Sequence, residues 1–212
     1  MNTKGFDKVI LLSRDEESET IKFKQIFSVG VQYVGQALQM ARAFQGAVEY
    51  VTINDKKVLN FNFQKAIDIV NNHPEMAIVG TVNQTISQST AVVKAMIDKV
   101  VELLQELLSV SLTAAETEAY EKAIKEAFTD LQQQDGDAWI FWQSTEAHKT
   151  TYQYNILFAV QNESTGSVML ALPIALTITV DIEKEKVLFI TVKDEHNYDV
   201  TVQAMQVAEA LK

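Results

Sequence analysis

Three runs without a single charged side chain occupy most of residues 151–192: TYQYNILFAVQN, SVMLALPIALTITV and VLFITV. In the first run, aromatic or aliphatic residues alternate with polar ones over much of its length, which is the period of a β-strand. Residues 163–166 and 183–186 separate the runs and have the glycine or the charges that are typical of turns. The runs therefore predict an antiparallel meander with strands at residues 151–162, 167–181 and 186–193.

The first two predicted strands are unusually long. At roughly 3.3 Å per residue they extend about 40 and 45 Å, against a usual strand length of about 17–20 Å. A β-strand needs only roughly 9–11 residues to cross a bilayer, so these strands are long enough to do so. Pro173 lies inside the second strand and has no amide proton, so we expect a bend, a bulge or an edge position there.

Composition favours one soluble domain over residues 1–212. The chain has 212 residues with 47% hydrophobic content, and no linker rich in proline, glycine or serine divides it. No stretch approaches the roughly 18 apolar residues of a membrane helix, and the absence of cysteine excludes disulfides and thiol chemistry. The net charge of -10 argues against nucleic acid as a partner, and it leaves apolar contact as the main attraction to any membrane.

The rest of the chain predicts helices in pairs followed by strands. We expect short strands at residues 8–14 and 138–142, a β-hairpin at 48–53 and 57–63, and a poorly readable segment at 75–90. Helices are expected at residues 27–48, 64–71, 91–112 and 113–134, and Thr113 with Glu116 forms a capping box at the start of the last one. This order is typical of an α+β fold in layers.

No residue pattern indicates catalysis. His73, His148 and His196 stand apart in polar contexts, and the nucleotide-binding, metalloprotease and EF-hand motifs are absent from the sequence. Acidic residues at helical spacing are better explained as a solvated helix face. We therefore expect a protein that is not an enzyme and that needs no cofactor and no metal.

The segment AWIFW at residues 138–142 has two interpretations. Trp139 and Trp142 could anchor the chain at a membrane interface, because indole favours the headgroup region. Alternatively, one tryptophan packs in the core and the other lies half exposed at a sheet edge. The second interpretation is the more common outcome for such residues.

AWIFW, together with YQYNILFAVQN at 152–162, TGSVM at 165–169, Pro173 and VLFITVKD at 187–194, closely resembles the Cyt delta-endotoxins, cytolytic toxins of insecticidal crystal-forming bacilli. Residues 39–45 and 96–103 extend the resemblance upstream. The resemblance implies one cytolysin domain in which a mainly antiparallel β-sheet lies between two layers of α-helical hairpins. It also implies an extracellular protein, secreted or released from inclusions, that binds phospholipid and permeabilises target-cell membranes without chemistry.

Some features depart from the family pattern. The chain resembles a core from which longer terminal extensions have been trimmed. The loop at residues 183–186 lies where some members dock another crystal toxin, and Lys184 and Glu185 match its charges. Thr177, Thr179 and Gln206 lack charges that the family carries nearby, which bears on whether this chain has such a partner.

We expect strands rather than helices to enter the membrane and to self-oligomerise there. Five charged residues on the helix at 91–112 would each cost about 2.5–3.5 kcal/mol at mid-bilayer, whereas the strands have no such cost. The helix at 27–48 is a second candidate because it has little charge. The residues expected to contact the membrane are Trp139, Phe141, Trp142, Tyr152, Tyr154, Ile156, Phe158, Val160, Val168, Leu170, Leu172, Ile174, Leu176, Ile178, Val187 and Phe189.

Two alternatives remain open at this stage. The protein could spread on the bilayer and disrupt it like a detergent instead of forming a pore. It could also be a non-lytic module that binds lipid or glycan, or a docking partner for another toxin.

Overall fold

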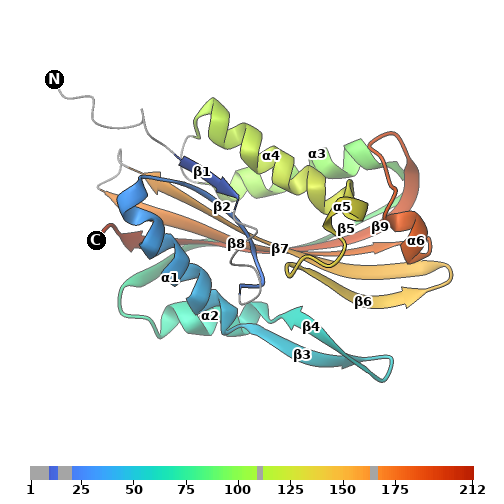
Figure 1. Ribbon diagram of the computed structural model, residues 1–212, viewed down its shortest axis with the longest axis horizontal. Coiled ribbons are helices and arrows are strands. Elements are labelled where there is room, and N and C mark those ends of the chain that lie inside the picture. Colours follow the sequence, from blue (N-terminus) through green and yellow to red (C-terminus); the bar gives the residue numbers. More distant parts are fainter. Residues whose placement is uncertain (1–9, 14–20, 109–111, 163–166) are drawn as a thin grey trace.

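A seven-stranded mixed sheet runs through the centre of the computed structural model, which describes residues 10–13, 21–108, 112–162 and 167–212 (Figure 1). Its strands are β1 (Ile10–Ser13), β2 (Lys24–Val29), β5 (Met76–Val92), β6 (Ile140–Glu146), β7 (Lys149–Asn162), β8 (Val168–Val180) and β9 (Glu195–Ala210). They are ordered β1-β2-β7-β8-β9-β5, and β6 also pairs with β7. Only the β2–β7 pair is parallel.

Helices cover both faces of this sheet (Figure 1). On one face lie the short 3-10 helix η1 (Val31–Tyr33), α1 (Val34–Gln45), the hairpin of β3 (Val48–Ile53) and β4 (Lys56–Phe61), and α2 (Phe63–Asn71). On the other lie α3 (Val93–Leu107), α4 (Ala114–Phe128), α5 (Leu131–Gln134) and α6 (Lys184–Val187). This arrangement confirms the fold class expected from the sequence, a sheet between two helical layers.

The two long strands are confirmed. β7 has 14 residues and β8 has 13, and they pair in one unbroken register from Thr150–Val180 to Asn162–Val168. Because helices pack on both faces of the sheet over much of β7 and β8, most of their side chains are buried. Their lack of charge follows from this, since an unpaired charge in such a position is costly.

Pro173 does not lie at an edge, because β8 runs between β7 and β9. The register between β8 and β9 pairs Ala171 with Val207 and Ile174 with Ala204, and within these described strands it skips Leu172 and Pro173. The proline has no N–H to offer to β9, so the ladder is interrupted there without a shift in register.

The predicted third strand at residues 186–193 is wrong. Residues 184–187 form helix α6 and residues 188–194 form turns, in which the Thr191 N–H donates to Asp194 Oδ2 at 2.8 Å. Val187 and Ile190 are both buried and lie three residues apart, which is helical spacing. A short apolar run of this kind fits a strand and a helical turn equally well. The third long strand is β9, which pairs with β8 over most of its length.

Helix boundaries also differ from the predictions. The helix expected at residues 27–48 begins only at Val34, because residues 27–29 complete the buried strand β2. The helix expected at 113–134 divides after Phe128, where Asp130 adopts a left-handed φ of 56°. Residues 91–92 belong to β5 rather than to the helix that follows, α3.

The predicted capping box at the start of α4 is confirmed. Thr113 Oγ1 accepts from the Glu116 N–H at 3.2 Å, and Glu116 Oε1 accepts from the Thr113 N–H at 2.8 Å. The second carboxylate oxygen, Glu116 Oε2, accepts from Ser28 Oγ of β2 at 2.6 Å. The same buried glutamate therefore caps α4 and joins it to the sheet.

We predict that Thr113→Ala lowers the free energy of unfolding by about 1 kcal/mol, because it removes the side-chain acceptor at the helix start. Thr113→Ser keeps the acceptor and should retain most of the stability. Urea denaturation followed by circular dichroism measures both variants. Equal stability of Thr113→Ala and the unmodified protein would contradict this role.

Candidate functional site

Nine of the residues expected to contact the membrane on β7 and β8 gather on one face of the sheet. This is the face under α3 and α4, and each of these side chains is at most 3% exposed: Tyr152, Tyr154, Ile156, Phe158, Val160, Leu172, Ile174, Leu176 and Ile178. β9 adds Val200, Val202 and Ala204 to the same face. We call this set the covered apolar face.

The opposite face of the sheet changes character along the strands. Beneath α1 and α2 it is apolar, with Leu157 and Ala159 of β7 and Ala171 and Ala175 of β8. Farther from α1 it becomes polar and only partly covered. Hydroxyl pairs cross the strands there, Thr151 with Thr179 at 2.9 Å and Thr85 with Thr201 at 3.0 Å between Oγ1 atoms, and Ser87 Oγ donates to Asp199 Oδ1 at 2.5 Å.

At the end of the sheet farther from α1, one face is therefore apolar and the other is polar. Here β6, the first half of β7, the last half of β8, the first half of β9 and the middle of β5 pair antiparallel to one another. Among the described strands, β5 and β6 form the two edges of this region. Both edge strands contain register shifts, at residues 78–80 and 88–91 of β5 and at 142–144 of β6, which discourage accidental edge pairing in solution.

Polar contacts hold α4 and α5 against the covered apolar face. Tyr152 Oη donates to the carbonyl of Ala127 at 2.7 Å, and Tyr154 Oη donates to Gln134 Oε1. Lys24 of β2, which is largely buried, forms an ion pair with Glu126. These contacts give the helical layer a defined position that apolar packing alone does not specify.

Burial raises the pKa of three tyrosines in this region. Desolvation is the main cause for Tyr120, Tyr152 and Tyr198, with a smaller contribution from the neighbouring Glu121, from other tyrosines and from Asp194, respectively. Each ring is at most 2% exposed, so the phenolate is disfavoured in the folded protein.

In the folded protein the two tryptophans lie as the core interpretation expects. Trp139 is only 2% exposed and belongs to the core under α4. Trp142 is half-buried on the edge strand β6, with its ring 5.1 Å from that of Tyr152. Phe141 and Leu170 are buried as well, and Val168 is half-buried.

Val187 and Phe189, also predicted to contact the membrane, lie outside the sheet. Val187 is buried at the end of α6, whereas Phe189 is 61% exposed in the turn that follows. Phe189 is therefore already at the surface of the folded protein.

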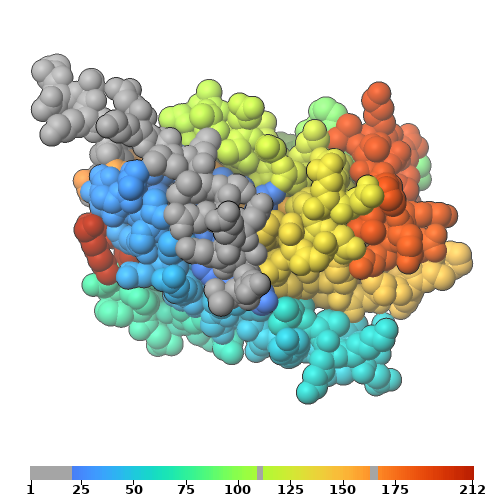
Figure 2. All heavy atoms as spheres, viewed as in Figure 1, coloured from blue at the N-terminus to red at the C-terminus, as the bar shows by residue number. Residues whose placement is uncertain are grey.

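The predicted docking residues lie on α6, beside α5 (Figure 2). Lys184 Nζ lies 4.5 Å from the centre of the Trp142 ring and 3.5 Å from Asp135 Oδ1. Glu185 is exposed. The two residues are thus not equivalent, because Lys184 already binds groups of this chain.

β5 is the strand of the candidate site that the sequence did not predict. In its middle, half-buried Val82 and Ile86 alternate with exposed Thr81, Asn83 and Thr85. This alternation was the available signal, but glutamine, serine and threonine at neighbouring positions weaken it. In its middle, α3 lies along one face of β5, so the other face remains in water and can carry those polar residues.

Membrane-spanning helices and metal-ligand clusters are absent from the described part of the chain. No helix in it is long and apolar enough to span a bilayer, and no cluster of potential metal ligands occurs in it. His148 is exposed and His73 and His196 are partly exposed, at separate positions along the chain.

The whole chain, residues 1–212, matches the family model described as Bacillus thuringiensis toxin. It is 44% identical over 195 residues to the Type-2Aa cytolytic delta-endotoxin of Bacillus thuringiensis subsp. kyushuensis, covering 92% of this chain and 73% of that protein. It is 46% identical over 207 residues to the Type-1Ab cytolytic delta-endotoxin of subsp. medellin, covering 96% and 83%.

Solved structures agree with the sequence comparison. The activated Cyt2Ba monomer from subsp. israelensis has a TM-score of 0.83 and 40% identity, covering 90% of this chain and 99% of that one. A structure described as a delta-endotoxin has a TM-score of 0.85 and 42% identity, covering 100% and 90%.

We predict that the buried tyrosines make the protein unfold cooperatively in alkali. An unfolded tyrosine has a pKa near 10.0 and the folded pKa values are higher, so their stabilising effect is complete below pH 10 and is lost above it. Each tyrosine then costs about 1.4 kcal/mol per pH unit. The tyrosinate absorbance of these three buried tyrosines should therefore appear together with the loss of native far-ultraviolet circular dichroism above pH 10.

Tyr120→Phe supplies the control. It removes one of the three ionising groups, so the stability of this variant should fall less steeply with pH. The full tyrosinate absorbance of all six tyrosines in a protein that keeps its native circular dichroism would contradict the prediction.

Proposed function

Because this chain belongs to the Bacillus thuringiensis toxin family, we propose that it is a cytolytic toxin that binds phospholipid bilayers and permeabilises them. The observation that carries the proposal is the covered apolar face, which two amphipathic helices separate from water. In the proposed mechanism, lipid replaces α3 and α4 on this face.

Energetics require lipid to be present when the helices leave. Burial of a large apolar side chain contributes about 1.5–3 kcal/mol, so exposing the whole covered apolar face to water would cost on the order of 20 kcal/mol. Native domains are stable by only about 5–15 kcal/mol. The face therefore stays covered in solution, and a bilayer offers an apolar environment that removes this cost.

The helices themselves are poor candidates for insertion. Lys94, Asp98, Lys99, Glu102 and Glu106 of α3 are all exposed, so that helix can lie at the interface with its charges in water. α1 contains only one charged residue, Arg42, but its 12 residues extend about 18 Å, less than the roughly 30 Å of a hydrocarbon core.

The amphipathic end of the sheet is suited to oligomerisation. Loss of α3 and α4 would leave an apolar face toward lipid and hydroxyl-rich strands toward water, as in the wall of an aqueous pore. Pairing of β5 in one copy with β6 in the next would extend this sheet and satisfy its free backbone groups. This proposal favours a strand-built pore over detergent-like disruption.

Three further elements complete the proposal. The toxin acts from outside the target cell, and its action includes no catalytic step. Phe189 makes an early contact with the bilayer, because it is exposed before any rearrangement. Docking of another crystal toxin at α6 would use Glu185 more than Lys184, since Lys184 already contacts Trp142 and Asp135.

We predict that a disulfide between Gly80→Cys and Leu107→Cys abolishes dye release from phosphatidylcholine liposomes. A Cβ built at Gly80 would lie 2.9 Å from Leu107 Cδ1, so these positions on β5 and α3 face each other. The bond would hold the far end of α3 on the sheet. The chain has no cysteine of its own, and reduction of the same sample should restore release.

Gly46→Cys with Ile69→Cys is the matched control. A Cβ at Gly46 would lie 3.3 Å from Ile69 Cδ1, and this disulfide would join α1 to α2 without fixing either helix to the sheet. It should leave release unchanged. Undiminished release from the oxidised Gly80→Cys/Leu107→Cys protein would refute departure of α3, and membrane binding without release from the reduced protein would indicate a non-lytic module.

A further inference from the structure

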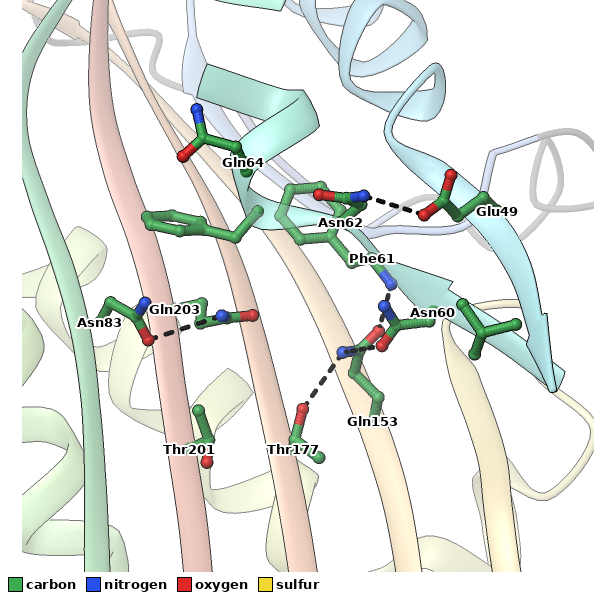
Figure 3. A pocket seen from close by; sticks show the side chains of 12 residues that line it. Glu49, Asn60, Phe61, Asn62, Gln64, Asn83, Gln153, Thr177, Thr201 and Gln203 are labelled. Atoms are coloured by element: carbon green, nitrogen blue, oxygen red, sulfur yellow. Dashed lines mark hydrogen bonds between the residues drawn. The ribbon is translucent and has the colours of Figure 1, made fainter. Parts of the chain in front are cut away.

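A hollow of about 600 Å³ lies on the open polar face of the sheet, beneath the β3–β4 hairpin and the start of α2 (Figure 3). Its volume is within the range of about 300–1,000 Å³ that is usual for small-molecule sites. Uncharged polar side chains form most of its lining: Asn60, Asn62, Gln64, Asn83, Gln153, Thr177, Thr201 and Gln203. This hollow lies on the opposite face of the sheet from α3 and α4, on the polar face that the proposed pore turns toward water.

One wall of the hollow is fixed by buried hydrogen bonds. Gln153 is 1% exposed, accepts from the Phe61 N–H at 2.7 Å and donates to Asn60 Oδ1 at 3.2 Å and Thr177 Oγ1 at 3.1 Å. Gln143 also donates to Asn60 Oδ1, at 3.2 Å. These bonds join the hairpin to the sheet, so the wall keeps its shape without a ligand.

The floor, by contrast, offers polar groups with unused bonding capacity. Gln203 Nε2 donates to Asn83 Oδ1 at 3.5 Å, a long contact that leaves the Asn83 amide donors and the Gln203 carbonyl with no hydrogen-bond partner among the described residues (Figure 3). Asn83 is exposed and Gln203 and Thr201 are half-buried. Donors and acceptors therefore alternate on a surface that a ligand can reach.

The charges around the hollow exclude an anionic ligand. Glu49 is the one charged residue of its lining, and Lys65, outside the lining, approaches Glu49 Oε2 at 3.6 Å. A phosphate group would meet no lining cation and one carboxylate. Half-buried Phe63 and Val51 supply apolar surface beside the amides.

We propose that this hollow binds a neutral sugar. Amides and hydroxyls can exchange paired donor and acceptor bonds with sugar hydroxyls, and the apolar C–H face of a pyranose ring can pack on Phe63 and Val51. The sugar belongs to a glycolipid headgroup or to a free or protein-linked glycan. In either case the hollow adds recognition of a glycosylated surface to the proposed activity.

The test measures binding of lactose, chitotriose, maltotriose and mannotriose by saturation-transfer NMR and calorimetry, with phosphocholine as the comparator. We expect at least one sugar to bind and phosphocholine not to bind in the hollow. Asn83→Ala and Gln203→Ala should each weaken sugar binding roughly tenfold, equivalent to about 1.4 kcal/mol. Gln84→Ala is the matched control, because Gln84 is next in the chain but lies beside Lys99 and Glu102 on the other face.

Vesicles distinguish the two sources. Stronger binding to phosphatidylcholine vesicles that contain galactosylceramide, with competition by the free sugar, identifies a glycolipid headgroup. Sugar binding without a glycolipid effect identifies a free or protein-linked glycan. The proposal is overturned if none of the four sugars binds, if Asn83→Ala and Gln203→Ala bind as Gln84→Ala does, or if phosphocholine occupies the hollow. Dye release from vesicles without sugar is a separate readout, so the two proposals can fail independently.

Discussion

The packing of α3 and α4 on one face of the sheet is the interaction on which the rest of this structure depends. It buries the aromatic and aliphatic side chains of β7, β8 and β9, which would otherwise be incompatible with a water-exposed sheet. The buried capping glutamate Glu116 and the Lys24–Glu126 ion pair then fix where the helices lie. The same packing keeps the strands that are best suited to a bilayer away from water.

The sequence predicted the parts of this arrangement that rest on long, regular patterns. The strands around Tyr154 and Ile174, the amphipathic helix around Met96 and the Thr113 capping box are where they were expected, because periodicity and capping are local signals. The run at residues 187–192 does not form the predicted strand, since six uncharged residues, five of them apolar, fit a strand as well as a helix end followed by a turn. The sequence did not predict the edge strand β5. It pairs with β9, which is far away in the sequence, and polar residues interrupt its alternating pattern.

The candidate site shows the same division. Alternation placed the apolar residues of β7 on one face, and the structure adds the partners on β8 and β9 that make this face continuous. Sequence alone could not show that the second face is apolar near α1 and polar farther away. The structure pairs Thr179 with Thr151 and Thr177 with Thr201 on the neighbouring strands, and these pairs make that end of the face polar. The polar end of the second face lies opposite the covered apolar face. One sheet therefore has a lipid-compatible face and, on its other side, a hydroxyl-rich one.

Spin labels at Ile178 and Thr179 test the central claim most directly, because these neighbours on β8 face opposite sides of the sheet. In water, a label at 178 should be inaccessible to both oxygen and a polar nickel reagent, whereas a label at 179 should be accessible to the nickel reagent. On liposomes, the account predicts that 178 becomes accessible to oxygen, which concentrates in lipid, while 179 keeps its contact with water. A label at 178 that stays inaccessible to oxygen while the liposomes leak would contradict the replacement of α3 and α4 by lipid.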